Sequence, residues 1–226
     1  MSAALVTGAS RGIGRAIALR LAASHDIVAV ARSTSDLDEL ARTIAEGGGR
    51  CRTIPLDLTD GSAVRYALSG VAVDVLVNNA GVGVMKPLLE MEPGEWARMM
   101  DVNVNALYHV TRAVLPGMIE RGRGHVVNIG SLAGRSSFAG GTGYTGSKHF
   151  LVGFSESLML EVRDRGVKVS VVMPGSVNTS FGGGAERDKS WALQAEDVAE
   201  AVAHVIDTPP HVLVSRVEMR PRSPQK

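Results

Sequence analysis

The sequence predicts an α/β protein in which helices cover both faces of one doubly wound parallel sheet. From residue 3 onward, short apolar segments alternate with longer amphipathic segments, the pattern of buried parallel strands joined by helices. The first apolar segment leads directly into a glycine-rich turn that opens a helix. No other repeat and no linker interrupts the alternation, so we expect residues 1–226 to form a single domain.

The apolar segments that we expect to be strands cover residues 3–6, 27–31, 51–56, 73–77, 125–129, 167–173 and 212–217. The first helix is expected to run from the glycine turn to about residue 23. Further helices are expected over residues 35–46, 60–69, 93–101, 104–121, 144–163 and 196–206. Ser35 and Asp36 are expected to cap the second helix. Asn103 lies at the junction of two helical stretches, where it either caps a backbone group or holds a polar partner.

Two segments near the C-terminal end are not assigned to helix or strand. Residues 176–193 form a glycine-rich loop with a few apolar anchors, which we interpret as a candidate lid or else as a disordered crossover. Residues 220–226 are expected to be a flexible tail.

Composition and charge exclude several classes of partner. The chain has 24 Lys and Arg against 23 Asp and Glu, so its net charge of +1 gives no electrostatic case for nucleic acid or an anionic membrane. The partners are expected to be small molecules and further copies of the chain. The apolar strand that follows Met1 directly, without a basic leader, and the lack of a membrane-length apolar run favour the cytoplasm. With Cys51 as the only cysteine and no histidine pair at zinc spacing, no metal is implied.

Glycines 8, 12 and 14 follow the first predicted strand and open the first helix. They let the backbone turn sharply and let a diphosphate approach the helix N-terminus, where free N–H groups favour anions. Their spacing is not the G-x-G-x-x-G of the standard dinucleotide fingerprint. This turn by itself therefore only suggests a nucleotide.

The end of the second strand carries Arg32 and Ser33, where a dinucleotide fold reads the adenosine ribose. An acid at this place would bind the 2′-hydroxyl of NAD, whereas a guanidinium, helped by Arg11, would bind a 2′-phosphate. The sequence therefore favours NADP(H) over NAD(H), unless Arg32 is simply a solvated residue after a strand. Asp57 follows the third strand and either accepts a hydrogen bond from an adenine amino group or forms a helix-entry turn.

Tyr144 and Lys148 are four residues apart in a predicted helix and would share one face of it. A neighbouring ammonium group favours the phenolate and lowers the pKa of a tyrosine from about 10, which makes the pair a candidate proton donor for a reacting oxygen. The alternative is an unrelated Tyr and Lys on a helix surface. Asn78 and Asn79 bring side-chain amides to the carboxyl edge of the sheet, where open α/β sheets bind ligands.

Taken together, these motifs resemble the short-chain dehydrogenase/reductase family along nearly the whole chain. The matching segments are Thr7-Gly8-x3-Gly12-x-Gly14, Asp57-Leu58, Asn78-Asn79-Ala80-Gly81, Asn103, Ser131, Tyr144-x3-Lys148 and Pro174-Gly175-x-Val177-x-Thr179. The resemblance implies a Rossmann-like sheet of about seven strands and an NADP(H)-dependent oxidoreductase acting on a carbonyl or secondary alcohol of a small substrate.

The resemblance also implies roles for four catalytic residues. Tyr144 would give its proton to the substrate carbonyl oxygen as hydride arrives from the nicotinamide, and Ser131 would hydrogen-bond that oxygen. Lys148 would hold the nicotinamide ribose and lower the pKa of Tyr144. Asn103 would position a water that relays protons.

The cofactor contacts follow from the resemblance as well. The glycine turn would bind the diphosphate, Thr179 and the Val177 backbone would hold the carboxamide, and Asp57 and Asn79 would lie along the adenosine. The residues expected to contact NADP(H) are Gly8, Ser10, Arg11, Gly12, Ile13, Gly14, Arg32, Ser33, Asp57, Leu58, Asn79, Ala80, Gly81, Tyr144, Lys148, Pro174, Gly175, Val177 and Thr179.

Within the family, residues 111–118 and 217–221 are similar to NADP-dependent 3-hydroxy acid dehydrogenases of the serine type. The shorter loop at 176–193 leaves the substrate open. Arg135, Arg187 and Lys189 are candidates for meeting a substrate carboxylate, or are simply solvated. The alternatives are a 3-oxoacyl-thioester reductase and, from another class, a non-catalytic NADP-binding redox sensor.

The resemblance implies a homo-oligomer, either a dimer or a tetramer, formed through the two long helices. Their apolar stripes serve packing on the sheet in any case. These stripes are Leu107, Val110, Val114 and Met118, and Leu151, Phe154, Leu158 and Val162.

Overall fold

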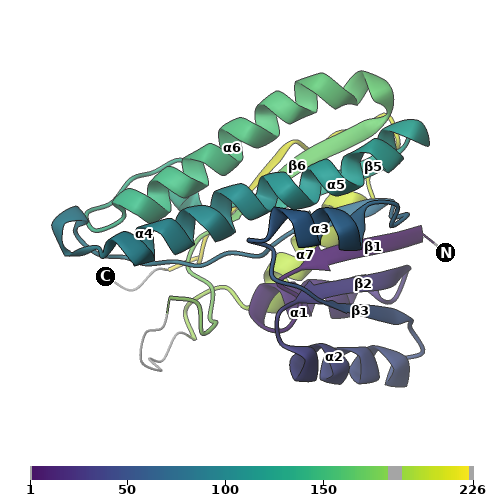
Figure 1. Ribbon diagram of the computed structural model, residues 1–226, viewed down its shortest axis with the longest axis horizontal. Coiled ribbons are helices and arrows are strands. Elements are labelled where there is room, and N and C mark those ends of the chain that lie inside the picture. The colour runs from purple at the N-terminus through teal and green to yellow at the C-terminus, as the bar shows by residue number, and fades with distance from the viewer. Residues whose placement is uncertain (1, 183–189, 224–226) are drawn as a thin grey trace.

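The computed structural model describes residues 2–182 and 190–223, and its centre is one parallel sheet (Figure 1). The strands are β1 Ser2–Thr7, β2 His25–Ala31, β3 Cys51–Pro55, β4 Val75–Asn78, β5 Gly124–Ile129, β6 Val167–Pro174 and β7 Arg216–Met219. Their order is β3-β2-β1-β4-β5-β6-β7, and every neighbouring pair is parallel. The predicted doubly wound α/β fold is confirmed.

Helices cover both faces of this sheet, and each face has its own apolar core (Figure 1). On one face lie α1 Gly12–Leu21, α2 Thr34–Glu46 and α7 Ala195–Ile206. On the other lie α3 Gly61–Leu68, α5 Ala106–Glu120 and α6 Thr142–Val162. The apolar stripes of α5 and α6 are buried against the sheet, except for the half-buried Phe154, so their sequence pattern is explained by packing.

Shorter elements connect these layers. They are α4 Pro93–Met100, the π-helical turn η2 Asp101–Asn105 and the 3-10 turns η1 Leu88–Glu90, η3 Leu132–Gly134 and η4 Arg163–Arg165. The break that we expected at Asn103 is this π-turn, through which the helix continues from α4 into α5. A π-turn adds a residue to the helix and is frequent at functional sites.

The winding of the sheet reverses between β1 and β4. Strand β1 pairs with β2 on one side and with β4 on the other, so the connections leave in opposite directions from this point. The carboxyl ends of β1, β4, β5 and β6 therefore lie together at one edge. The turns that follow these strands carry most of the predicted site.

Two local predictions were wrong. Strand β7 is Arg216–Met219 rather than 212–217, because Val214 packs on the core from a connection and its carbonyl accepts a hydrogen bond from Ser170 Oγ at 2.6 Å. The cap of α2 is Ser33 rather than Ser35, since the Ser33 hydroxyl accepts from the Asp36 N–H at 3.4 Å. The cap error comes from choosing between neighbouring serines, and the strand error comes from reading the apolar connection at Val214 as part of the strand.

The described ends of the loop 176–193 are held together. Val177 and Leu193 form an isolated parallel bridge, and the Asn178 N–H donates to the Leu193 carbonyl at 2.8 Å. Gly183, Gly184, Arg187 and Lys189 lie outside the described residues, so the lid stays a prediction. In the described part of the chain, no helix has the length and apolar character needed to cross a membrane.

Candidate active site

Tyr144 and Lys148 lie in the first turns of α6 and are both buried, with 8% and 5% of their surfaces exposed. The Lys148 ammonium nitrogen is 5.9 Å from the centre of the Tyr144 ring and donates a hydrogen bond to the Ile129 carbonyl at the end of β5, at 3.0 Å. Burial lowers the pKa of Lys148 to about 8. The lysine is thus held at the carboxyl edge of the sheet and remains mostly protonated at neutral pH.

The pKa of Tyr144 differs from our expectation. Burial raises it above 10, and a side-chain hydrogen bond with Ser131 opposes that rise. We expected Lys148 to lower it, but in the protein by itself the loss of solvent around the phenol is the larger effect. Ser131 and Tyr144 are nevertheless brought together as predicted.

The side chain of Asn103 is fully engaged at the π-turn. Its Oδ1 accepts from the Val82 N–H at 2.8 Å, and its Nδ2 donates to the Val82 carbonyl at 2.9 Å and to Ser147 Oγ at 3.0 Å. Ser147 in turn donates to the Tyr144 carbonyl at 2.8 Å. Asn103 therefore binds the segment after β4 to the helix that carries Tyr144.

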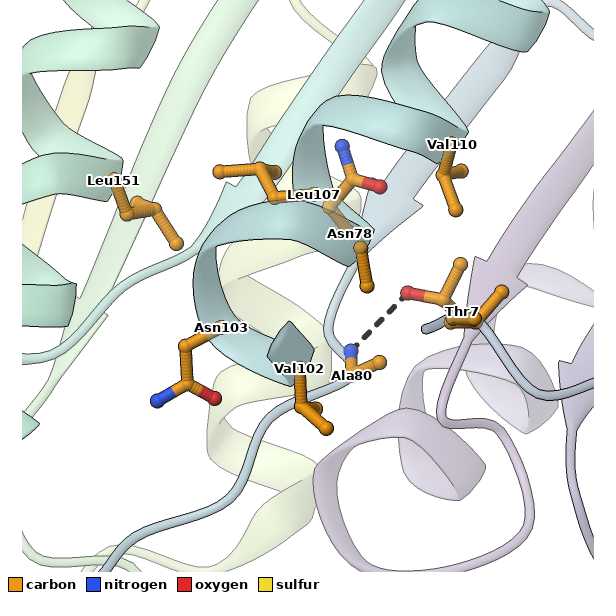
Figure 2. Close-up of a pocket in the computed structure, with 10 residues that line it drawn as sticks. Thr7, Asn78, Ala80, Val102, Asn103, Leu107, Val110 and Leu151 are labelled. Carbon is orange, nitrogen blue, oxygen red and sulfur yellow. Dashed lines mark hydrogen bonds between the residues drawn. The ribbon is translucent and has the colours of Figure 1, made fainter. Parts of the chain in front are cut away.

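A cavity of about 10 Å³ lies beside Asn103, between the sheet and α5. Figure 2 shows that Thr7 and Asn78 from two strands contribute to its wall, and that the Thr7 hydroxyl accepts from the Ala80 N–H at 3.1 Å. Its other walls are largely apolar and include Leu58. A volume of this size holds one water molecule at most, so this cavity is not a cofactor or substrate site.

The glycine turn between β1 and α1 is compact because its glycines touch one another. Gly8 and Gly12 have φ angles of +64° and +54°, which favour glycine, and a Cβ on Gly14 would lie 2.2 Å from the Gly8 oxygen. The Asn79 amide donates to the carbonyls of Thr7 at 2.9 Å and Gly8 at 3.3 Å. Asn79 thus braces the turn rather than leaving its amide nitrogen free for the adenosine.

The N-terminus of α1 differs from those of α2 and α3. Ser33 and Asp60 cap α2 and α3 with side-chain oxygens, whereas no side chain caps α1. Ser10 and Ile13 flank this end of the helix, half-buried. An uncapped N-terminus behind a tight glycine turn fits a diphosphate.

Arg11 and Arg32 are both exposed at this edge. Among residues 2–182 and 190–223, neither takes part in an ion pair.

Two hydrogen bonds from Thr59 lower the pKa of Asp57, and the charge of Arg32 lowers it further. Both Thr59 bonds go to Asp57 Oδ1, which confirms a helix-entry turn and leaves Oδ2 outside that turn.

The segments after β4 and β6 complete the edge. A Cβ on Gly81 would be in ordinary van der Waals contact with Lys148 Nζ at 3.8 Å, so this turn lies directly beside the ammonium group. The Gly175 N–H donates to the Met219 carbonyl at 2.8 Å, which ties the turn after Pro174 to β7. Thr179 lies against the glycine turn, because a Cβ on Gly12 would be 3.5 Å from its Cγ2. These predicted residues thus lie in the turns at the carboxyl edge of the sheet.

Comparison with known proteins identifies this arrangement. A sequence model described as short chain dehydrogenase matches residues 2–190. The chain belongs to that family.

Relatives of this short-chain dehydrogenase span nearly the whole chain. The NADP-dependent 3-hydroxy acid dehydrogenase of Escherichia coli K12 is 36% identical over 96% of this chain and 94% of its own length. A 3-oxoacyl-[acyl-carrier-protein] reductase of Vibrio harveyi is 36% identical over 79% of this chain and 74% of its own. A closed form of serine dehydrogenase solved with NADP+ superposes with a TM-score of 0.92, at 36% identity, covering 99% of this chain and 96% of the other.

Ser147 is the site residue of this short-chain dehydrogenase that our motif reading missed. It is 1% exposed and joins Asn103 to Tyr144 by hydrogen bonds. Its place inside the Tyr144-x3-Lys148 segment could have indicated this role. A serine within a helix hydrogen-bonds either solvent or a backbone carbonyl, and a buried one has only the second choice. In the described residues, no group of three His, Cys, Asp or Glu side chains is arranged to hold a metal.

Proposed function

We propose that this protein is an NADP(H)-dependent oxidoreductase that interconverts a carbonyl and a secondary alcohol in a small substrate. The observation that carries the proposal is that Tyr144, Ser131 and Lys148 lie together at one edge of the sheet. The same edge holds the glycine turn and the N-terminus of α1, which no side chain caps. A phenol, a hydroxyl and an ammonium group placed together suit proton transfer to an oxygen that develops negative charge.

In the reducing direction, Tyr144 donates its proton to the carbonyl oxygen of the substrate. The bound nicotinamide supplies the hydride. Ser131 stabilises the charge that develops on the oxygen, and its hydrogen bond to Tyr144 orients both groups toward one atom. A buried phenol with a raised pKa remains protonated at neutral pH and is ready to act as the acid.

Lys148 has two proposed tasks in the same step. Its ammonium group binds the nicotinamide ribose, and its charge favours the phenolate that forms as Tyr144 gives up the proton. Asn103 acts by positioning, because its side chain fixes the Val82 segment and α6. A relay water at the π-turn Asp101–Asn105 is part of the proposal.

NADP(H) is the proposed cofactor in preference to NAD(H). Arg11 and Arg32 are exposed guanidinium groups without a carboxylate partner among the described residues, and a 2′-phosphate would satisfy both. The Ser33 hydroxyl caps α2 and shares a hydrogen bond with Ser35 Oγ at 3.2 Å, so its proposed part in phosphate binding rests mainly on its backbone.

Two other functions stay as alternatives. A 3-oxoacyl-thioester reductase would use the same four residues, and it is favoured by the 36% identity to the Vibrio harveyi protein. A redox sensor would bind NADP(H) at the same residues but would not reduce or oxidise a substrate. The complete Asn-Ser-Tyr-Lys set argues against the sensor, since binding alone requires no buried acid.

We also propose a cytoplasmic homo-oligomer, a dimer or tetramer of single-domain subunits, joined through α5 and α6. Gly146 and Gly153 of α6 have open space where a Cβ would stand, and Phe150 and Leu160 on the same stripe are 40% and 58% exposed. Small residues and exposed apolar groups on one helix face suit close packing against a second copy. Light scattering should give a multiple of the 23.7 kDa chain mass, and Leu160→Glu should lower it.

The function is tested by following cofactor oxidation at 340 nm with purified protein. NADPH and NADH are offered separately against ketones, 3-oxo acids, 3-oxoacyl thioesters and quinones, with serine and NADP+ in the reverse direction. Turnover with NADPH on a carbonyl supports the proposal. Tight NADPH binding without turnover on any substrate would favour the sensor.

A further inference from the structure

The residues that surround Tyr144 on its outer side are apolar. The ring of Phe181 lies 5.8 Å from the Tyr144 ring at an angle of 56°. Gly83 packs against this phenylalanine so tightly that a Cβ there would be 2.6 Å from Phe181 and 3.1 Å from Met85. Phe181 and Met85 are 42% and 45% exposed, so their unburied faces are available to a ligand.

The inner side of Tyr144 is apolar as well. Tyr144 belongs to a buried cluster with Met99 and Ala133, against which Val82 and Met91 pack. A Cβ on Gly143 would lie 2.3 Å from the Met99 methyl group, so the first turn of α6 rests directly on that methionine. A reacting carbonyl next to the phenol would therefore have hydrocarbon and thioether neighbours.

Two exposed cations near these residues, Lys86 and Arg135, are paired with carboxylates in the described part of the chain, whereas Lys148 is assigned to the nicotinamide ribose. Lys86, next to Met85, donates to Glu95 at 2.6 Å, and this hydrogen bond lowers the pKa of Glu95. Arg135 follows the turn η3 that begins after Ser131, and it pairs with Glu218 of β7. A substrate anion would therefore meet a competing carboxylate at both groups.

Glu218 holds two arginines at once. Arg135 binds its Oε1, and Arg220 binds its Oε2 at 2.9 Å. Arg135 first, and then Arg220, lower the pKa of Glu218, so this carboxylate stays ionised through the neutral range. A substrate carboxylate would have to compete with Glu218 for Arg135 and would be repelled by it at close range.

We propose that the substrate of this enzyme is an uncharged carbonyl compound or secondary alcohol with an apolar group next to the reacting carbon, and that Glu218 withholds Arg135 from anionic substrates. The apolar group packs against Phe181 and Met85, while the oxygen faces Tyr144 and Ser131. This inference rests on the proposed function, and it separates the protein from a dehydrogenase selective for hydroxy acids.

The experiment uses matched pairs that differ in one charge. Methyl 4-acetylbenzoate is compared with 4-acetylbenzoate, and ethyl acetoacetate with acetoacetate, under NADPH. We expect kcat/KM to be at least about tenfold higher for each ester, because each acid must compete with Glu218 for Arg135 and is repelled by that carboxylate. Equal values, or a preference for the acids, would overturn the inference.

Glu218→Gln tests the proposed role of the carboxylate. It should raise kcat/KM for the acids about tenfold by freeing Arg135 and Arg220, and leave the esters within about twofold. Glu200→Gln is the matched control, since it removes a carboxylate of an arginine pair between α1 and α7, with Arg20 at 2.6 Å, on the other face of the sheet. An acid rate that does not rise in Glu218→Gln, or that rises equally in Glu200→Gln, would contradict the role of Glu218.

Phe181→Ala tests the apolar contact. It should lower kcat/KM for the esters about tenfold and change the acids by less, because only the esters use the aromatic face. Unchanged ester kinetics would contradict the contact.

If no carbonyl is reduced at all, the proposed function fails. Calorimetry on the NADP+-loaded protein then decides the substrate class. The inference requires the esters to bind more tightly than the acids, and the reverse order overturns it.

Discussion

Two groups of arginines lie along the same sheet edge, and they differ in whether a carboxylate accompanies them. Arg11 and Arg32, at the glycine turn, have no ion-pair partner in the described part of the chain. Arg135 and Arg220, at the other end of the edge, share Glu218. Since all four side chains are accessible to solvent, the partner rather than burial distinguishes them. In our proposals, the unpaired arginines bind the 2′-phosphate of NADP(H), whereas the paired arginines disfavour anionic substrates.

The largest expected effect separates chemistry from cofactor binding along this edge. Tyr144→Phe removes the proton donor and leaves the arginines, the glycine turn and the apolar neighbours in place. We expect kcat to fall by about a thousandfold or more, with the Kd for NADPH changed by less than about threefold. Stopped-flow turnover and fluorescence titration of NADPH measure the two quantities. A near-normal kcat would remove the phenol from the mechanism.

A second change would give the unpaired arginines, Arg11 and Arg32, a carboxylate like the one that Arg135 and Arg220 share. Arg32→Asp places a carboxylate beside Arg11 and should shift the ratio of kcat/KM for NADPH over NADH toward NADH by at least about tenfold, since a charge-assisted phosphate contact of roughly 1.5–3 kcal/mol is lost. Arg42→Asp is the control, because Arg42 is an exposed arginine of α2 and the change in net charge is identical. An unaltered ratio in Arg32→Asp would mean that Arg32 does not read the phosphate.

Salt should affect the two regions differently. Exposed charges are screened when the Debye length shortens to about 10 Å or less near 0.1 M ionic strength. Raising sodium chloride from 50 to 300 mM should increase KM for NADPH about fivefold and KM for NADH by less, while KM for an uncharged ester stays constant. A salt-sensitive ester KM would indicate that unpaired charge acts at the substrate end.

The smallest effect concerns pH. Arginines keep their charge at all relevant pH values, whereas Lys148 has a pKa of about 8 in the free protein and becomes neutral above it. Between pH 7 and 9.5, we expect the Kd for NADP+ to rise about threefold, as the ribose contact loses its charge, and the Kd for 2′,5′-ADP to stay constant. Lys148→Met should abolish the difference. Parallel rises for both ligands would place the titration outside Lys148.

The sequence predicted the order and type of the helices and strands well because the five central strands are largely buried on both faces and read as apolar runs. The last strand was misplaced because its signal is shared with a buried connection: Val214 is apolar yet holds Ser170 through its carbonyl. Local hydrophobicity does not distinguish a strand from a packed loop.

The site residues were predicted as a set, but their partners were not. The engagement of Asn79 with the glycine turn depends on β1 lying beside β4, and that of Arg135 depends on a residue 83 positions away in β7. The pKa of Tyr144 depends on how much solvent the methionines near it exclude. Such properties arise from tertiary contacts, which no local motif contains.

The bridge between Val177 and Leu193 also matters for how this enzyme diversifies. Because the two ends of the segment are already joined by backbone hydrogen bonds, lengthening or replacing what lies between them adds only a closure cost that grows with the logarithm of length, about 0.6 kcal/mol per doubling. We expect that a change of length or sequence between these two residues leaves the sheet and the four proposed catalytic side chains in place. Loop grafting at these two residues is therefore the natural entry point for engineering new substrate ranges on this scaffold.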